Sequence, residues 1–295
     1  MLNLCIRARK CLILQFANQP IHEQPCLPLG GFFSVGQAIE QLLAAKTAGN
    51  RTPRYVAALG QSLRQFSRGR EQLDLHELSV PLIEKWLANY PRASTRAGWL
   101  NRISTLLSFC VRRGYLQKNP CDVIERIRID RCPPQILTVA QSRTLLGDCP
   151  TVCKPYLVLA MFAGIRPEEV LRMDWSHVNL QTRTARVEGK TRRRRIVPLP
   201  EIAVAELGKH PLKSGAIAPS NSTVRRWKRA ACKVIGLEHW PQDLLRHTAA
   251  SYLLAWHQDA GKVATMLGNS AAILLTHYHE PVTAENCADF WKATL

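Results

Sequence analysis

The sequence predicts a mainly α-helical protein with one small antiparallel β-sheet, divided into a helical N-terminal domain and a mixed α+β C-terminal domain. Apolar residues recur at helical spacing over most of residues 34–126 and again over much of 137–295. Short β-branched stretches around a basic turn interrupt that period within residues 179–199. Between the two helical regions, residues 127–136 carry two prolines and little apolar content, which is typical of an interdomain linker.

The N-terminal domain is expected to begin at Ser34. Residues 1–33 show no sustained period and carry three prolines and a Gly-Gly pair, so we expect a poorly ordered arm there. Ser34 and Gln37 form a capping-box pattern ahead of an apolar stripe, which predicts a first helix. Thr52 followed by Pro53 is typical of the start of a second helix.

Two further helices complete a four-helix unit over residues 34–126. A short helix carries Leu82, and a longer one runs from about Ser94 to Arg113, where Gly114 stops it. Arginines are dispersed over the outer faces of this unit, as phosphate contacts along a duplex require. Any single one of them could instead be a solvated surface residue. The candidates for DNA contact in this unit are Arg54, Arg96 and Arg102.

The C-terminal domain, residues 137–295, opens with a second capping-box pattern at Thr138 and Gln141. Residues 179–188 and 194–199 are expected to pair as a small antiparallel hairpin or sheet. Helical patterns resume at Ser222, Pro241, Gly261 and Thr283. The last of them predicts a terminal amphipathic helix.

Charge and composition restrict the class of partner and the compartment. Lys plus Arg is 40 and Asp plus Glu is 22, a net charge of +18, which predicts a polyanion such as nucleic acid as partner. A merely solvated basic surface is the alternative. We expect no membrane association, because no apolar run approaches the roughly 18 residues of a spanning helix. The ten cysteines form no CxxC pair, so we expect reduced thiols in a cytoplasmic protein.

Two arginines are candidates for holding a phosphodiester. Arg166 lies between Gly164 and Pro167 at a predicted loop-to-helix junction, where its fork could reach a phosphate beside free backbone N–H groups. Taken alone, it could equally form a surface salt bridge. Arg246 lies within an otherwise apolar helix, so its guanidinium must be paired or must face a site.

Candidates for a proton donor and a nucleophile are also present. Lys190 stands at the predicted hairpin turn, where nearby arginines would lower its pKa and favour service as an acid. The alternative is a non-specific phosphate-binding patch formed with the arginines that follow it. Those arginines are Arg192, Arg193, Arg194 and Arg195. Tyr278 has histidine on both sides at a helix end, a polar context in which it could attack phosphorus, although most lone tyrosines are structural.

The order Arg166, Lys190, Arg246, Tyr278, together with the His247 that follows Arg246, resembles the tyrosine recombinases, also called phage-integrase-type site-specific recombinases. The resemblance covers roughly residues 34–295 and is most specific in the C-terminal half. It implies a core-DNA-binding domain followed by a catalytic domain that cuts and rejoins DNA. Tyr278 would form a 3′-phosphotyrosine link, Lys190 would protonate the released 5′-hydroxyl, and the two arginines would hold the phosphate.

The same resemblance implies partners and cofactors. The partner would be double-stranded DNA, with a homotetramer in the synapse, a monomer or weak oligomer in the free state, and room for an accessory DNA-bending protein. No metal or nucleotide cofactor is implied, because the covalent link conserves the bond energy. The terminal helix could dock on a neighbouring protomer, as in the family, or pack on its own domain.

Two positions depart from the family pattern. Asp243 stands three residues before Arg246, where the family usually has histidine, and Asn269 stands where histidine or tryptophan is usual. Asp243 could accept the proton of Tyr278, but its charge near the phosphate costs electrostatic stabilisation. Asn269 can donate a hydrogen bond to a phosphate oxygen.

Two other functions stay open, the first of them supported by these departures. One is a catalytically weakened DNA-binding protein of the same fold, and the other is a type IB topoisomerase-like DNA-relaxing enzyme. A metal-dependent nuclease is disfavoured, because no carboxylate cluster has suitable spacing.

Overall fold

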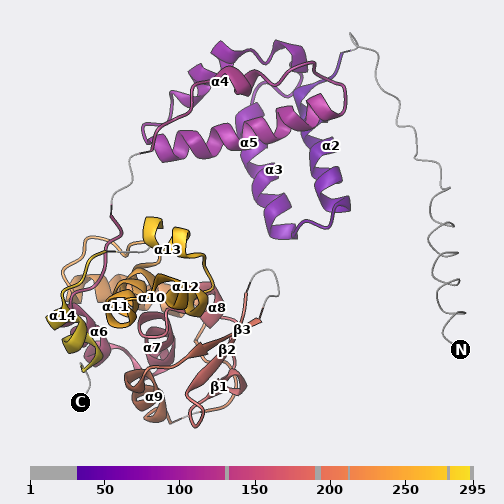
Figure 1. The fold of residues 1–295 in the computed structure, drawn as a ribbon. Helices are drawn as coiled ribbons and strands as arrows, with labels where there is room; N and C mark the ends of the chain where they lie inside the picture. The colour runs from indigo at the N-terminus through magenta and orange to yellow at the C-terminus, as the bar shows by residue number, and fades with distance from the viewer. Residues whose placement is uncertain (1–31, 130–132, 190–193, 212, 278–279, 293–295) are drawn as a thin grey trace, which may run out of the picture. The chain divides into compact units, whose positions relative to one another are not determined.

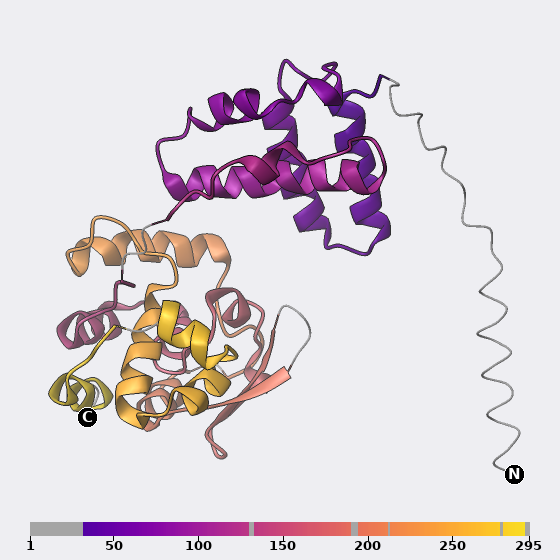
Figure 2. The same ribbon diagram turned by 45° about the horizontal axis from the view of Figure 1, so that its top comes forward.

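The chain forms two compact units, Met1–Asp130 and Arg131–Leu295, in a computed structural model. The structure describes residues 32–129, 133–189, 194–211, 213–277 and 280–292. Figures 1 and 2 show the helices of both units and the small sheet of the second. The predicted fold class, mainly α with a small antiparallel sheet, is confirmed.

The first unit is the predicted four-helix unit. Helices α2 and α3 lie side by side and both contact the long helix α5 (Figure 1). Ser34 caps α2 through the predicted capping box with Gln37, and the Thr52 side chain caps α3, which has Pro53 at its first position. The helices are α2 (Val35–Ala48), α3 (Pro53–Ser67), α4 (Val80–Leu87) and α5 (Ala93–Arg112), with short 3₁₀ turns η1 (Leu75–Glu77) and η2 (Pro120–Val123).

Aromatic rings hold this unit together. The Trp86 ring meets Phe66, Tyr90 and Trp99 at centroid separations of 5.1, 5.1 and 5.0 Å. Phe33 is buried and its ring lies 4.4 Å from that of Tyr115. The packed unit therefore begins one residue earlier than the pattern around Ser34 predicts. Residues 1–31 of the predicted arm lie outside the described residues.

The second unit packs helices around a buried central helix and carries a sheet at its edge (Figure 2). Every residue of α7 except Lys154 is buried, and α7 contacts α6, α8, α9 and α11. The helices are α6 (Val139–Asp148), α7 (Lys154–Met161), α8 (Pro167–Val170), α9 (Glu201–Gly208), α10 (Asn221–Val234), α11 (Leu244–His257), α12 (Ala260–Leu267), α13 (Ala271–His277) and α14 (Ala284–Trp291). Two 3₁₀ turns, η3 (Thr151–Cys153) and η4 (Trp175–His177), complete the described helical elements.

The sheet has three antiparallel strands in the order β1-β2-β3: β1 (Val178–Asn179), β2 (Thr184–Glu188) and β3 (Arg194–Pro198). The stretch 179–188 that we expected to be one strand is divided by a turn, in which Arg183 has a φ of +52°. A positive φ breaks the extended backbone and returns the chain for pairing. The predicted antiparallel pairing between the stretch that ends at Glu188 and the stretch that begins at Arg194 is confirmed as β2 with β3, and Glu188 lies opposite Arg194.

The terminal helix α14 packs on its own unit. The Phe290 ring is wholly buried and stacks on Tyr252 of α11 at a centroid separation of 3.8 Å. We expected this helix either to dock on a neighbouring protomer or to pack on its own domain. The described residues pack on their own domain. None of the helices in the described ranges combines the length and the apolar character needed to cross a membrane.

Candidate functional site

Arg166 lies where the sequence predicts it, at the junction between a tight loop and helix α8. Gly164 has a φ of +62°, a conformation that glycine adopts without strain. Arg166 is the N-cap of α8 and Pro167 follows at the first helical position. The Glu169 carboxylate accepts a hydrogen bond from the Arg166 backbone N–H at 3.2 Å and another from its Nη1 at 3.3 Å.

Arg246 is the largest fully buried side chain of the described residues. It projects from α11 and is 0% exposed. Its guanidinium is paired, which is one of the two alternatives that the sequence left open. Its Nη1 donates to the backbone oxygen of Gly164, and its Nη2 donates to that of Leu267 at 2.7 Å. Arg246 therefore ties the loop before Arg166 to the end of α12.

Three arginines of the site converge on the C-terminal end of α12. Three consecutive carbonyl groups accept hydrogen bonds from three arginines on three other elements: Met266 from Arg195, Leu267 from Arg246 and Gly268 from Arg166. The last carbonyl groups of a helix have no partner within the helix and carry partial negative charge. This helix end thus neutralises part of the charge that would otherwise drive the guanidinium groups apart.

Asn269 follows this helix end and faces Arg166. Its Oδ1 accepts a hydrogen bond from Arg166 Nη2 at 2.5 Å. Because the oxygen is used in this way, the amide nitrogen Nδ2 is the group left to donate. That nitrogen is buried and has no hydrogen-bond partner among the described residues. Asn269 can therefore offer a donor next to the Arg166 guanidinium.

Glu169 is a site residue that we did not select from the sequence. Its carboxylate is 4% exposed and bonds to Arg195 at 2.7 and 3.2 Å as well as to Arg166. Burial alone raises the pKa of this carboxyl, but the hydrogen bond and charge of Arg195 and the charge of Arg166 outweigh it, so the pKa lies below its usual range. The only sequence signal was its place three residues after Arg166, where a capping-box carboxylate stands.

Asp243 lies at the start of α11 in the left-handed conformation, with φ +53° and ψ 21°. Burial lowers the pKa of His247, one turn further on, and the opposing charge of Asp243 partly offsets the effect. Burial also lowers the pKa of Lys228 on α10 to about 8, again against the charge of Asp243. Asp243 thus lies in the electrostatic neighbourhood of two groups that could carry a proton.

The Lys228 ammonium has an aromatic environment. Its Nζ lies 5.2 Å from the ring centroid of Tyr156 and 5.3 Å from that of Trp240. Ring faces attract a cation electrostatically and at the same time exclude water. This explains how a lysine can be largely withdrawn from solvent beside Asp243.

The predicted DNA-contact arginines differ in their surroundings. Arg96 donates to the backbone oxygens of Tyr90 and Pro91 at 2.9 and 2.8 Å. Arg102 is exposed and stacks over Trp99, and Arg54 is also exposed. In the second unit, four predicted residues lie outside the described residues: Lys190, Arg192, Arg193 and Tyr278.

Arg194 and Arg195 are neighbours on β3 with opposite environments. The Arg194 side chain is 74% exposed and lies 3.8 Å from Glu188, whereas that of Arg195 is 15% exposed and pairs with Glu169. Of the six predicted catalytic residues, the structure brings Arg166, Arg246 and Asn269 together at the end of α12. Asp243 lies on the same helix as Arg246, three residues earlier.

The described residues on both sides of position 278 are held against α12 and α11. Helix α13 begins two residues after Asn269 and ends at His277. Beyond it, the backbone N–H of Glu280 donates to Ser251 Oγ on α11 at 2.9 Å. The seven residues of α13 span about 10 Å at the usual helical rise.

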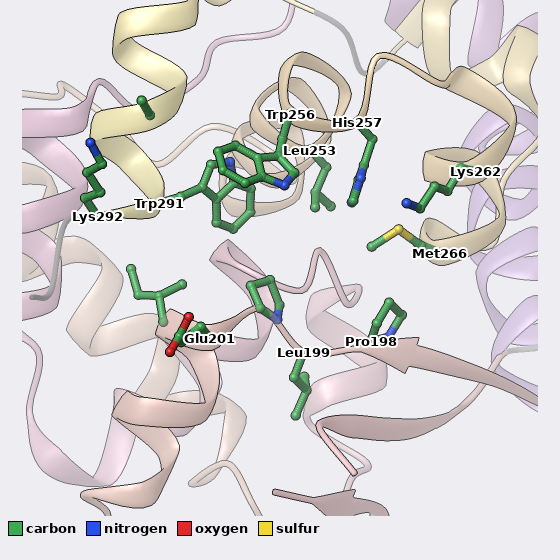
Figure 3. Close-up of a pocket in the computed structure, with 13 residues that line it drawn as sticks. Pro198, Leu199, Glu201, Leu253, Trp256, His257, Lys262, Met266, Trp291 and Lys292 are labelled. Atoms are coloured by element: carbon green, nitrogen blue, oxygen red, sulfur yellow. The ribbon is translucent and has the colours of Figure 1, made fainter. Parts of the chain in front are cut away.

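A separate cavity of about 460 Å³ lies between α11, α12, α14 and the loop after β3 (Figure 3). Apolar side chains line most of it, among them Leu253, Trp256 and Trp291, with the amine of Lys262 near its edge. None of Arg166, Arg246 or Asn269 lines this cavity. An apolar cavity of this kind does not suit a phosphate.

The C-terminal unit matches the model of the phage integrase family over residues 135–283. Among curated relatives, the tyrosine recombinase XerC of Mycobacterium sp. (strain KMS) is 28% identical, covering 80% of this chain and 90% of the relative. XerC of Chlamydia muridarum (strain MoPn / Nigg) is 24% identical, covering 74% and 78%.

Solved structures share the fold. A lambda integrase dimer bound to a COC′ core site superposes with a TM-score of 0.72 at 17% identity, covering 85% of this chain and 97% of the integrase. The Tn1549 transposon integrase in complex with a circular intermediate DNA gives a TM-score of 0.68 at 14% identity, covering 88% and 98%. The matched segment begins before α6 and ends at the N-cap of α14, so it contains both arginines and the helix end that joins them. The chain belongs to the phage integrase family.

Proposed function

We propose that this protein is a site-specific DNA recombinase that cuts and rejoins DNA through a 3′-phosphotyrosine intermediate at Tyr278. One observation carries the proposal: Arg166, Arg246 and Asn269 converge on the end of α12, from which α13 leads directly to position 278. The curated relatives, which are tyrosine recombinases, support the same activity.

Each residue has a distinct role in the proposed transfer. Tyr278 attacks phosphorus and the 5′-oxygen leaves, with Lys190 giving it a proton. Arg166 and Arg246 neutralise the non-bridging oxygens while phosphorus is five-coordinate. Asn269 donates a hydrogen bond from Nδ2 to one of those oxygens, and Asp243 accepts the proton of the tyrosine. No metal ion is required, because the guanidinium groups supply the positive charge.

The two arginines differ in exposure, so the phosphate would contact them one after the other. The Arg166 side chain is 35% exposed, whereas Arg246 is 0% exposed. Arg166 therefore meets the phosphate first. Contact with Arg246 requires the residues that cover it to move, so we propose that DNA binding completes the clamp.

The partners follow from the charge and from the relatives. The net charge of +18 supports binding to DNA. We propose that residues 34–126 bind the core site and that residues 137–295 hold the catalytic centre, joined by the linker 127–136. Another solved relative is a lambda integrase tetramer bound to a Holliday junction, with a TM-score of 0.69 at 16% identity over 92% of this chain. It supports a homotetramer in the synapse.

A DNA-binding protein without strand transfer is the second candidate. Asp243 and the complete burial of Arg246 favour it, because one adds negative charge near the phosphate and the other withholds a cation. A topoisomerase-like activity would give the same covalent link and would differ by acting without a partner site.

The test is covalent adduct formation. Wild-type protein and a Tyr278→Phe variant are incubated with a nicked suicide substrate built from DNA that flanks the gene, in the presence of a chelator. We expect a protein–DNA adduct on a denaturing gel with the wild type and none with the variant. Tyr55→Phe is the matched control, because Tyr55 is an exposed tyrosine in the first unit.

The outcomes separate the candidates. An adduct that maps to Tyr278 by peptide mass spectrometry, and that religates to a second DNA, supports recombination. An adduct that relaxes supercoiled plasmids of any sequence supports the topoisomerase-like activity. A shift on a native gel without any adduct, on a panel of flanking sites, would exclude strand transfer.

A further inference from the structure

Arg195 looks from the sequence like one more member of a basic run, but its contacts set it apart. Its guanidinium bonds to the Glu169 carboxylate at 2.7 and 3.2 Å, and its Nε donates to the Met266 oxygen at 3.3 Å. The side chains of Arg195 and Glu169 are 15% and 4% exposed. Two parallel bonds to one carboxylate fix the plane of the guanidinium, and a third bond fixes its rotation.

These bonds join three elements. Arg195 is on β3, Glu169 is on α8 three residues after Arg166, and Met266 is near the end of α12. The stem of Arg195 also passes close to the turn after α12: a Cβ added to Gly268 would lie 3.1 Å from its Cδ. Arg195 is thus packed between the two segments that carry Arg166 and Asn269.

A cavity borders this ion pair on the side of β2. This cavity of about 430 Å³ is lined by Glu169, Arg172, Arg186 and Glu188, among others. Side chains that face a cavity do not hold a strand against a helix. Among the described residues, the bonds between Arg195 and Glu169 therefore link β3 to α8 beside this cavity.

We propose that Arg195 is a positioning residue for strand cleavage: it fixes the β2–β3 hairpin relative to Arg166 and Asn269, and it does not contact DNA. In the sequence, the segment that joins β2 to β3 contains Lys190, the proposed proton donor. The proposal rests on the proposed function. It revises the DNA contact expected for Arg195 and leaves the one expected for Arg194 in place.

The chemistry of DNA strand cleavage explains why the position of the hairpin matters. A general acid acts only within hydrogen-bond reach of the leaving oxygen, about 2.6–3.2 Å, so a small displacement of the hairpin is costly. A misplacement of about 1 Å can lower a rate about 100-fold. Lysine cannot replace Arg195, because an ammonium does not provide the paired bonds of a guanidinium fork.

The experiment compares Arg195→Met and Arg195→Lys with Arg194→Met, using the full chain. DNA affinity is measured against salt concentration, and the rate of adduct formation is measured at saturating DNA. We expect Arg195→Met to lower the adduct rate about 100-fold while the salt dependence of binding stays unchanged. Arg194→Met should reduce the slope of log K against log salt by about 0.9, the loss of one phosphate contact. Arg195→Lys should not restore the rate.

A pH profile distinguishes positioning from general damage to the sheet. Without Arg195, the buried Glu169 carboxyl loses its strongest partner, so its pKa should rise. The adduct rate of Arg195→Met should therefore fall as the pH is lowered through a range where the wild-type rate is constant. In the double variant Glu169→Gln/Arg195→Met that fall should disappear. Arg186→Met, on the exposed face of β2, is the control for loss of an arginine from the sheet.

The two proposals fail in different ways. A wild-type protein that never forms an adduct refutes the proposed function and with it the positioning role, while the salt slope still shows whether Arg195 contacts DNA. Arg195 is a DNA contact, and the inference is wrong, if Arg195→Met reduces the slope as Arg194→Met does. An adduct rate within threefold of wild type would equally overturn the positioning role.

Discussion

Replacing Gly164 with alanine should lower both the free energy of unfolding and the rate of adduct formation. Gly164 has a φ of +62°, and its carbonyl oxygen accepts the hydrogen bond of Arg246 Nη1. A Cβ at this position would overlap Leu267 Cδ2 and would lie 3.2 Å from Ala249 Cβ. Leu267 supplies the other carbonyl that holds Arg246. The residue whose side chain must move to admit the methyl group is therefore also the residue whose backbone carbonyl holds Arg246.

The magnitude has two parts. A non-glycine residue in the left-handed conformation costs about 1–2 kcal/mol. Forcing an extra carbon into a packed core costs about 1–3 kcal/mol. Gly164→Ala should thus lower the free energy of unfolding by about 2–5 kcal/mol, out of a total of about 5–15 kcal/mol for an ordinary domain.

Two other glycines of the same unit separate these parts. Gly236 has a φ of +69° with nothing within 4 Å of an added Cβ, so Gly236→Ala should show only the conformational cost. Gly147 lies within α6 with open space around it, so Gly147→Ala should stabilise the unit by about 0.5–1 kcal/mol. Urea unfolding gives the three free energies, and the suicide substrate gives the adduct rates. If Gly164→Ala is no less stable than Gly236→Ala, the packing around Arg246 is not what we describe.

The Asp243 neighbourhood yields two further predictions. Lys228→Met should remove a pH dependence of stability: the pKa of Lys228 is about 8 in the folded chain and 10.5 ordinarily, so the unfolded chain binds more protons between these values. The wild-type free energy of unfolding should therefore rise relative to the variant as pH increases through that window, by about 1–3 kcal/mol after allowance for partial exposure. Urea unfolding of both proteins at several pH values measures this, and a difference between their free energies that does not change with pH would refute the prediction. Asp243→His, which installs the residue usual in the family and suits a φ of +53°, should raise the adduct rate about tenfold or more, and a lower rate would show that Asp243 has its own role.

Features set by neighbouring residues were predictable. The caps at Ser34 and Thr138 depend on side chains three residues away, and both form as expected. Arg166 precedes Pro167, and this pair alone places it at the start of a helix. Arg246 stands out because a charge in an apolar helix needs partners. In each case the signal lies within one turn of the residue concerned.

Features set by distant contacts were not predictable. Glu169 and Arg195 are 26 residues apart, and Arg195 is one of four consecutive arginines that the sequence does not distinguish. The alternation of a strand directs Arg194 and Arg195 to opposite faces, but which face meets α8 depends on the register with β2. The turn at Arg183 was missed for a similar reason, because a left-handed residue other than glycine gives little signal in a sequence.

The arrangement of charge explains how three guanidinium groups can lie around one helix end when no DNA is bound. Arg166, Arg195 and Arg246 contribute +3 and Glu169 contributes −1, an excess of 3 − 1 = +2 around one helix end. Such an excess is tolerable because each guanidinium donates to a carbonyl at the negative end of α12.

A phosphodiester brings one negative charge. Once the residues that cover Arg246 have moved, donors that are already oriented reorganise little when the charge on phosphorus grows. Asp243 opposes this attraction, but Lys228 lies within its electrostatic influence and is positively charged below pH 8. The two charges largely cancel at a distance. The departure at Asp243 therefore weakens the clamp less than an isolated carboxylate would, which is why we expect an active enzyme.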